Sequence, residues 1–136
     1  MSKNPNVKKI IITGSGGYIG SNLVKYFSKF KNYEILCIYR NKINLKVKKK
    51  NIKYLKHNLI NKIPKNKIEN NYDALLHFAG SKNDRLFVNT NKKKVFEGIK
   101  IDKNVIDFAV TKKIKLFIYA SSAAVYDLKE GESNYK

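Results

Sequence analysis

Short apolar segments alternate with longer mixed segments along most of the chain. Runs of four to eight apolar residues predict strands that are buried in a sheet. Such strands are predicted at 8–13, 34–39, 51–56, 72–79 and 114–120. Two of the segments between them, about 18–30 and 95–112, space their apolar residues as one face of a helix does. The pattern therefore predicts strands and helices in alternation.

The apolar spacing also predicts which side of each helix is apolar. The first helix would turn Ile19, Leu23 and Phe27 toward the sheet, with Lys25 and Lys29 in water. The apolar stripe predicted for the second helix consists of Val95, Ile99, Ile106, Ala109 and Val110. The segment 40–50 has no clean period and is predicted to be a loop, and a short helix is expected after Pro64.

Alternating strands and helices predict an α/β fold with a doubly wound parallel sheet and right-handed crossovers. In such sheets the ligand lies at the carboxyl ends of the strands, so the residues there become the candidates for function. We expect one domain at 1–126 and a loose polar tail at 127–136.

The strongest local signal follows the first strand, where residues 13–20 read TGSGGYIG. Gly14, Gly17 and Gly20 are spaced by three, and Gly16 lies between them. A strand, a glycine turn and a helix in this order place a pyrophosphate on the N-terminus of the helix. A side chain at Gly17 would block the phosphates, and one at Gly20 would push the helix off the sheet. A glycine-rich turn without a ligand is the alternative, but the flanking strand and helix favour a dinucleotide site.

Charge and composition add few constraints. The formal net charge of the 136 residues is +19, which predicts non-specific attraction to nucleic acids at low salt. Nearly all of this charge is lysine, and Arg40 and Arg85 are the only arginines, so specific nucleic-acid recognition is disfavoured. The single cysteine, Cys37, cannot form an internal disulfide. With no signal-peptide core and no segment of transmembrane length, a soluble cytoplasmic protein without membrane contacts is expected.

Three motifs resemble those of one known family. TGSGGYIGSNLV is similar to the TGxxGxxG fingerprint of the extended short-chain dehydrogenase/reductase family, the nucleotide-sugar epimerases and dehydratases. YDALLHFAG resembles its fourth-strand motif, and KNVIDFAVTKKIKLFIYASSAAVYD resembles its fifth helix–strand unit. The resemblance implies an NAD(P)-binding, Rossmann-like fold that corresponds to the N-terminal part of such enzymes and stops after about five strands.

The resemblance also implies which residues bind the cofactor. They are Gly14, Gly16, Gly17, Tyr18, Ile19, Gly20, Arg40, Asn58, Leu59, Phe78, Ala79, Gly80 and Ser121. Arg40 follows the second strand, where an acid binds the ribose of NAD and a basic residue accommodates the 2′-phosphate of NADP, so NADP is favoured over NAD. Asn58 stands where the family usually has an aspartate near the adenine. A simple turn asparagine is an equally good interpretation there.

The catalytic residues of the family are only partly present. Ser122 falls where the family has the serine or threonine that binds the substrate oxygen. The family also needs a tyrosine and a lysine in Y-x-x-x-K, whereas Tyr135 and Lys136 are adjacent. We therefore expect no turnover by this chain. His57 and His77 are interpreted as structural, and no metal site is expected.

The sequence thus favours the NAD(P)-binding portion of a nucleotide-sugar epimerase, dehydratase or reductase. Two alternatives remain open at this point: a non-catalytic NAD(P)-binding regulatory module, and a basic nucleic-acid-binding protein. A nucleotide sugar would be a substrate only in a longer form of the protein. The sequence fixes neither the sugar nor the oligomeric state.

Overall fold

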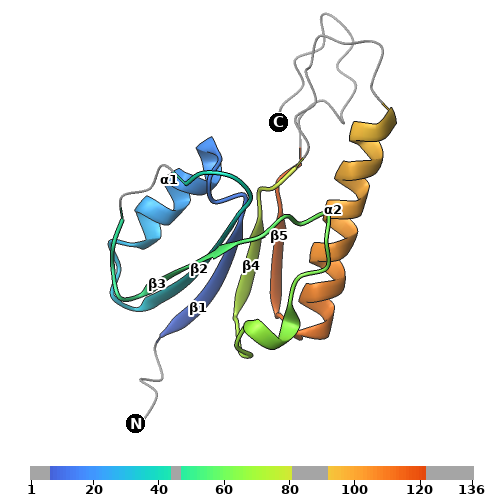
Figure 1. The fold of residues 1–136 in the computed structure, drawn as a ribbon. Helices are drawn as coiled ribbons and strands as arrows, with labels where there is room; N and C mark the ends of the chain where they lie inside the picture. Colours follow the sequence, from blue (N-terminus) through green and yellow to red (C-terminus); the bar gives the residue numbers. More distant parts are fainter. Residues whose placement is uncertain (1–6, 44–46, 81–91, 122–136) are drawn as a thin grey trace, which may run out of the picture.

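The computed structural model describes residues 7–43, 47–80 and 92–121. They form one five-stranded sheet in which all neighbouring strands are parallel. The strands are β1 (Lys8–Thr13), β2 (Tyr33–Tyr39), β3 (Ile52–Lys56), β4 (Ala74–His77) and β5 (Leu116–Tyr119). Their order across the sheet is β3-β2-β1-β4-β5, so the predicted doubly wound, Rossmann-like sheet is confirmed. Figure 1 shows this arrangement.

Two α-helices and one 3-10 turn complete the described fold: α1 (Tyr18–Phe27), α2 (Lys92–Thr111) and η1 (Lys65–Lys67). The short helix expected after Pro64 is η1, which begins directly after that proline. The predicted tail at 127–136 lies outside the described residues.

The two α-helices pack on opposite faces of the sheet. Successive residues of a strand point to opposite faces, so β1 contributes side chains to the core on both sides. Ile10 and Ile12 of β1 pack in one cluster with Val24 of α1. Ile11 lies in the other cluster, with Val105 and Phe108 of α2. Both helices are thus anchored to the central strand, with α1 and α2 on either side of the sheet (Figure 1).

The predicted apolar face of α1 is wrong at one position. The side chain of Ile19 is 54% exposed, whereas Gly20 and Val24 are buried and Leu23 and Phe27 are partly buried against the sheet. Gly20 contributes no side chain to a hydrophobic pattern, yet it is buried against the backbone of Gly14 and Ser15. The stripe is therefore rotated from the position that the apolar side chains suggest.

The stripe predicted for α2 is wrong at most positions. Its buried residues are Ile101, Val105, Phe108 and Ala109. Of the predicted set only Ala109 is buried, while the side chains of Ile99 and Val110 are 58% and 72% exposed. The helix carries two adjacent apolar stripes, and periodicity alone does not decide which of them contacts the sheet.

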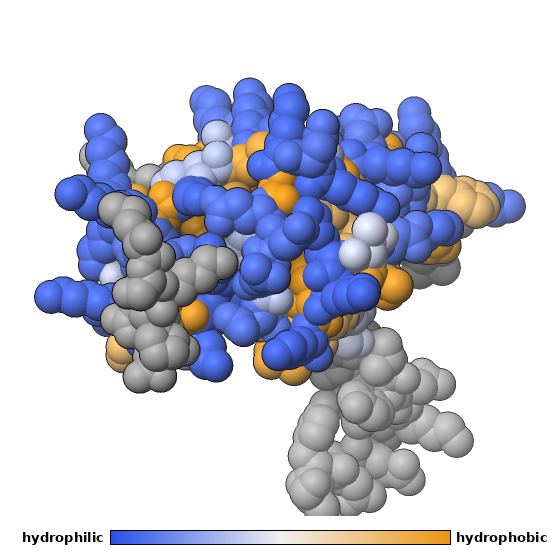
Figure 2. All heavy atoms as spheres, turned by 90° about the horizontal axis from the view of Figure 1, so that it is seen from below, coloured by the Kyte–Doolittle hydropathy of each residue, from blue (hydrophilic) through white to orange (hydrophobic). Residues whose placement is uncertain are grey.

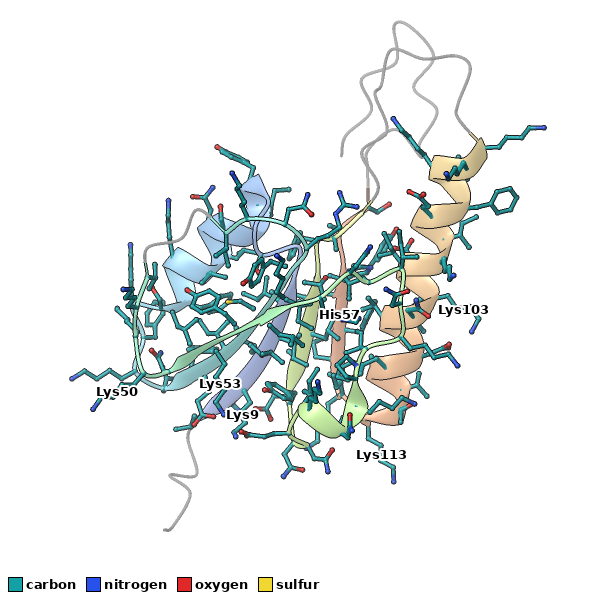
Figure 3. All side chains as sticks on the ribbon, viewed as in Figure 1. Lys9, Lys50, Lys53, His57, Lys103 and Lys113 are labelled. Atoms are coloured by element: carbon teal, nitrogen blue, oxygen red, sulfur yellow. The ribbon has the colours of Figure 1, made fainter. Side chains whose placement is uncertain are left out.

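The amino-terminal edge of the sheet is strongly hydrophilic. Lys9 Nζ lies 3.0 Å from a carboxylate oxygen of Glu34 and 3.0 Å from one of Glu69, and Lys53 pairs with Glu69 as well. The two ammonium groups lower the pKa of Glu69 to about 2. Figure 2, the view from below, shows mostly hydrophilic residues on this side. In Figure 3, Lys9, Lys50 and Lys53 lie along this lower end of the sheet.

No helix among the described residues combines the length and the apolar character needed to cross a membrane.

Candidate functional site

The strand order reverses at β1, because β2 and β3 lie on one side of it and β4 and β5 on the other. An open cleft of about 320 Å³ lies at the carboxyl ends of the strands at this reversal. The glycine turn after β1, the segments after β2, β3 and β4, and Ile101 of α2 form its walls. Doubly wound sheets bind their ligands at such a reversal, so this cleft is the candidate site.

The cleft brings together most of the residues that the sequence analysis assigned to a cofactor. These are Gly14, Gly16, Gly17, Arg40, Asn58, Leu59, Phe78, Ala79 and Gly80. They come from four segments that are well separated in the chain, and parallel pairing of the strands places all four at one edge. In Asn58 the carboxamide oxygen accepts a hydrogen bond from the backbone N–H of Ile60 at 3.3 Å, so this residue also shapes its own turn.

Close packing requires glycine at Gly14 and Gly20, at the two ends of this segment. Gly14 has φ of 67°, and a Cβ atom there would lie 2.5 Å from the carbonyl oxygen of Phe78 and 2.6 Å from the nitrogen of Ala79. A Cβ on Gly20 would collide with the carbonyl group of Gly14. The turn is therefore pressed against the end of β4 on one side and against the first turn of α1 on the other.

Gly17 is different, because packing does not explain it. A Cβ atom there would meet only the carbonyl oxygen of Gly14, at 3.2 Å, and Gly17 lines the cleft. It is also the N-cap of α1, which has no side-chain cap and no acidic residue in its first turn. Among the described residues, nothing accepts a hydrogen bond from the backbone N–H groups of Tyr18, Ile19 and Gly20. Free N–H groups beside an open glycine surface suit a phosphate group.

The charged side chains that line the cleft are all basic. Arg40, Lys42 and His57 line it, and its described lining includes no aspartate or glutamate. The carbonyl oxygen of Lys42 would lie 2.6 Å from a Cβ atom on Gly16, so the segment after β2 lies directly against the glycine turn. The cleft thus combines a helix N-terminus with positive side chains and fits a phosphorylated ligand.

Four predicted residues do not line the cleft. The side chains of Tyr18 and Ile19 are 85% and 54% exposed, so only their backbone faces the turn. Gly20 packs against Gly14, and Ser121 is exposed at the end of β5. Ser122, the predicted catalytic serine, lies outside the described residues.

The sequence analysis missed several residues that line the cleft, namely Tyr39, Asn41, Lys42, His57 and Ile101. His57 was assigned a structural role, and its Nε2 does lie 3.2 Å from the carbonyl oxygen of Asn61. Its place directly after a predicted strand is a signal that could have found it. No sequence signal indicates Ile101, because its position depends on how α2 packs.

A chain of hydrogen bonds lies behind the cleft and runs from the buried side chains of Thr13 and His77 to the exposed side chain of Tyr119. Thr13 Oγ1 is 2.6 Å from His77 Nδ1, and His77 Nε2 is 3.1 Å from Asp102 Oδ1. The hydroxyl of Tyr119 donates to Asp102 Oδ2 at 2.9 Å. Burial lowers the pKa of His77, and the carboxylate of Asp102 opposes this shift only in part. The structural interpretation of His77 agrees with these contacts.

No group of three or more histidine, cysteine or acidic residues in the described part of the chain could hold a metal ion. Cys37 is buried in β2, where burial raises the pKa of its thiol to about 12.

Comparison with known proteins relates this cleft to a family. The NAD dependent epimerase/dehydratase family model matches residues 10–135. A dTDP-D-glucose 4,6-dehydratase of Dictyostelium discoideum is 30% identical over 134 residues, which cover 88% of this chain and 30% of that protein. An ADP-L-glycero-D-manno-heptose-6-epimerase of Brachyspira hyodysenteriae is 32% identical, over 93% of this chain and 40% of its own length.

Solved structures share the fold. A UDP-galactose 4-epimerase superimposes with a TM-score of 0.72 at 24% identity, over 87% of this chain and 39% of its own. The Helicobacter pylori ADP-L-glycero-D-manno-heptose-6-epimerase gives 0.71 at 23% identity, over 100% and 46%. A UDP-glucuronic acid 4-epimerase variant from Bacillus cereus, solved with NAD, gives 0.72 at 22% identity, over 93% and 44%.

The chain spans between 30% and 40% of the length of the curated relatives that it matches. The family match, in contrast, extends over nearly the whole chain and includes the glycine turn and all five strands. The chain therefore belongs to the NAD-dependent epimerase/dehydratase family.

Proposed function

We propose that this chain is the cofactor-binding portion of an epimerase, dehydratase or reductase that acts on a nucleotide-activated sugar. The observation that carries the proposal is Gly17. It is open on the cleft side, it caps α1, and packing does not require it. The relatives support the substrate class, since their names refer to dTDP-, ADP- and UDP-linked sugars.

The residues of the cleft fit a dinucleotide in a definite order. The N–H groups at the start of α1 and the surface of Gly17 would hold the pyrophosphate. Arg40 and Lys42 would lie at the ribose of the adenosine half, and Asn58 and Leu59 at the adenine. Ala79 and Gly80 have small side chains or none, so they would let the nicotinamide half of the dinucleotide pass close to the backbone at the end of β4. When bound, the nicotinamide ring supplies the capacity to take up and return a hydride.

We further propose that the chain prefers NADP to NAD. Arg40 and Lys42 follow β2 and line the cleft, whereas no acidic side chain in its described lining could bind the ribose hydroxyls. Arg40→Ser should weaken NADP binding by about tenfold and leave NAD binding within about twofold, because a 2′-phosphate contact is charge-assisted. A change of equal size for both cofactors would contradict the preference.

This chain would bind the cofactor without completing the reaction. None of its tyrosines has a lysine four residues later, so Y-x-x-x-K does not occur within the 136 residues. Ser122 would bind the substrate oxygen in the longer enzyme, and a tyrosine supplied elsewhere would move the proton. Cofactor-dependent turnover of a nucleotide sugar by the purified chain would contradict this part of the proposal.

A calorimetric titration with NADP⁺ and NAD⁺ tests cofactor binding. Gly17→Val places a Cβ atom 3.2 Å from the carbonyl oxygen of Gly14, and circular dichroism checks that the fold accommodates this close contact. The variant should lose at least about tenfold in affinity. Val110→Ala on α2 is the control, since Val110 is 72% exposed and does not line the cleft. If Gly17→Val binds as well as the wild type, the phosphate is not held at this turn.

A further inference from the structure

Thr13, His77 and Tyr119 form one row across three adjacent strands. Thr13 is the register partner of His77, and His77 is the register partner of Tyr119. Two residues earlier, Ile11, Leu75 and Phe117 form a parallel row that packs in the core with α2. A polar row thus follows an apolar row on the same face of the sheet, and Asp102 of α2 binds it from above.

The contacts fix one consistent set of hydrogen-bond donors. The hydroxyl group of Tyr119 forms a hydrogen bond with one carboxylate oxygen of Asp102, and Nε2 of His77 forms one with the other. A carboxylate can only accept hydrogen bonds, so both partners are donors. His77 Nε2 therefore carries a hydrogen, and in a neutral ring Nδ1 is then an acceptor. The hydroxyl of Thr13, 2.6 Å away, donates to it. The side chain of His77 has no exposed surface, which favours the neutral ring.

This row ends directly behind the cleft. Thr13 precedes Gly14, and His77 precedes Phe78 and Ala79, whose backbone atoms crowd Gly14. The backbone bond between the same two segments, from Phe78 N to Thr13 O, is long at 3.3 Å. The side-chain bond of 2.6 Å from Thr13 to His77 is therefore the tighter of these two links.

We propose that His77 is a positioning residue, which in its neutral Nε2–H form holds the glycine turn at the distance from the β4 end that the dinucleotide requires. Asp102 and Tyr119 fix the orientation of the ring, and Thr13 transmits it to the turn. This inference rests on the proposed function, because the effect is exerted on cofactor binding.

A proton on Nδ1 would abolish the acceptor that Thr13 uses, so cofactor affinity should fall as His77 becomes charged. The groups that face the ring are Asp102 from α2, Tyr119 from β5 and the neutral Thr13 from β1. Phe117 of β5 also packs near it but does not titrate. Burial lowers the pKa of His77 from 6.5, so the site keeps its neutral ring at physiological pH and loses affinity only at a pH below that ordinary value.

Two substitutions of His77 separate the roles of its two ring nitrogens, because each keeps a polar atom near one nitrogen and removes the other. His77→Gln keeps a donor near Nε2 for Asp102 and removes the acceptor for Thr13. His77→Asn keeps an acceptor near Nδ1 and removes the bond to Asp102. Thr13→Val removes only the hydroxyl and nearly preserves volume, so it tests the link if a histidine variant fails to fold. Leu75→Val, in the apolar row of the same strand, is the matched control.

The measurement combines calorimetry with NADP⁺ and NAD⁺ between about pH 5.5 and about pH 8 and ¹⁵N NMR of the imidazole nitrogens. The sequence has two histidines, so the signals of His77 are those that His77→Gln lacks. We expect a neutral ring with the hydrogen on Nε2. At neutral pH, Thr13→Val and His77→Gln should weaken binding by about tenfold, and Leu75→Val by less than about twofold.

The wild-type dissociation constant should rise toward acid with the midpoint at which the His77 signals titrate, and His77→Gln should lack that step. A hydrogen on Nδ1 would overturn the inference. So would wild-type affinity in both Thr13→Val and His77→Gln, while the proposed function would stand. A wild-type chain that binds neither cofactor would overturn the proposed function and this inference together.

Discussion

The first and last strands of the described chain each contain a run of apolar residues but have very different surroundings. β1 lies between β2 and β4, and Ile11 and Ile12 have no exposed surface. β5 is also a parallel strand of apolar residues, but it is at the edge of the sheet, and its Leu116 and Ile118 are 52% and 43% exposed. Apolar runs predict strands, whereas burial depends on what lies beside and above them.

The same difference divides the candidate site. At the β1 end, backbone atoms at the end of β4 and at the start of α1 lie close to the turn and leave no room for side chains at Gly14 and Gly20. At the β5 end, Tyr119 is held by Asp102, but Ser121 is exposed and does not line the cleft. The part of the site that we propose for the cofactor is thus more closely packed than the part that would meet a substrate.

The largest effect should come from Gly14→Ala compared with Gly80→Ala. Gly14 combines positive φ with backbone contacts that a Cβ would violate, so the substitution should lower the free energy of unfolding by about 4 kcal/mol. Gly80→Ala adds the same methyl group in open space and should change it by less than about 0.5 kcal/mol. Urea denaturation followed by circular dichroism measures both. Equal effects would mean that the turn is not pressed against β4.

Leucine truncation compares the two strand environments directly. Leu75→Ala in β4 removes a fully buried side chain and should cost about 3 kcal/mol of stability. Leu116→Ala in β5 removes a half-exposed one and should cost less than about 1 kcal/mol. The same urea experiment reports both values. A Leu116→Ala loss as large as that of Leu75→Ala would show that something covers β5.

Thiol reactivity sharpens the comparison without a large change in stability. Burial raises the pKa of Cys37 to about 12, so it should react with a thiol reagent at about pH 8 only when the chain unfolds. In the variant Ile118→Cys, the new thiol should react at once and Cys37 slowly, which gives two phases in one protein. A single slow phase would mean that residue 118 is protected.

The smallest effect should be at the amino-terminal edge. The pKa of Glu69 is lowered to about 2 in the folded state, so its ion pairs stabilise the fold at a pH above its ordinary pKa. This stabilisation is lost as the pH falls from the ordinary pKa to the folded-state pKa of about 2. Glu69 is half exposed, so Glu69→Gln should cost less than about 1 kcal/mol at neutral pH, and less again in high salt. The difference between the two proteins should disappear in acid. A difference that grows toward low pH would have the wrong sign.

The sequence was sufficient for the strands and the glycine turn because both are local patterns. β1 begins and ends where predicted, and Gly14 and Gly20 are explained by the contacts that their spacing implied. The sides of the helices were not predictable in the same way. In α2 the choice between two apolar stripes depends on the sheet beneath it. In α1 one of the two buried positions is Gly20, which has no side chain and adds nothing to an apolar pattern.

The site shows the same limit. Arg40 and Asn58 could be found because each follows a predicted strand. Ile101 and Asp102 lie within a helix, and their positions beside the cleft and His77 follow only from tertiary packing. The sequence therefore located the candidate cleft from its loops and missed the contributions of α2.

The most direct test of the dinucleotide site is to map NADP⁺ binding on the ¹⁵N-labelled chain by amide chemical shifts in about 0.15 M salt. The account predicts saturable shifts at 14–20, 38–42, 57–59 and 78–80, the segments at the carboxyl edge of the sheet. The lysine-rich amino-terminal edge around Lys9, Lys53 and Glu69 should stay unchanged. Shifts spread over the lysines, or lost at this salt, would contradict it and leave only non-specific attraction of phosphate to a basic protein.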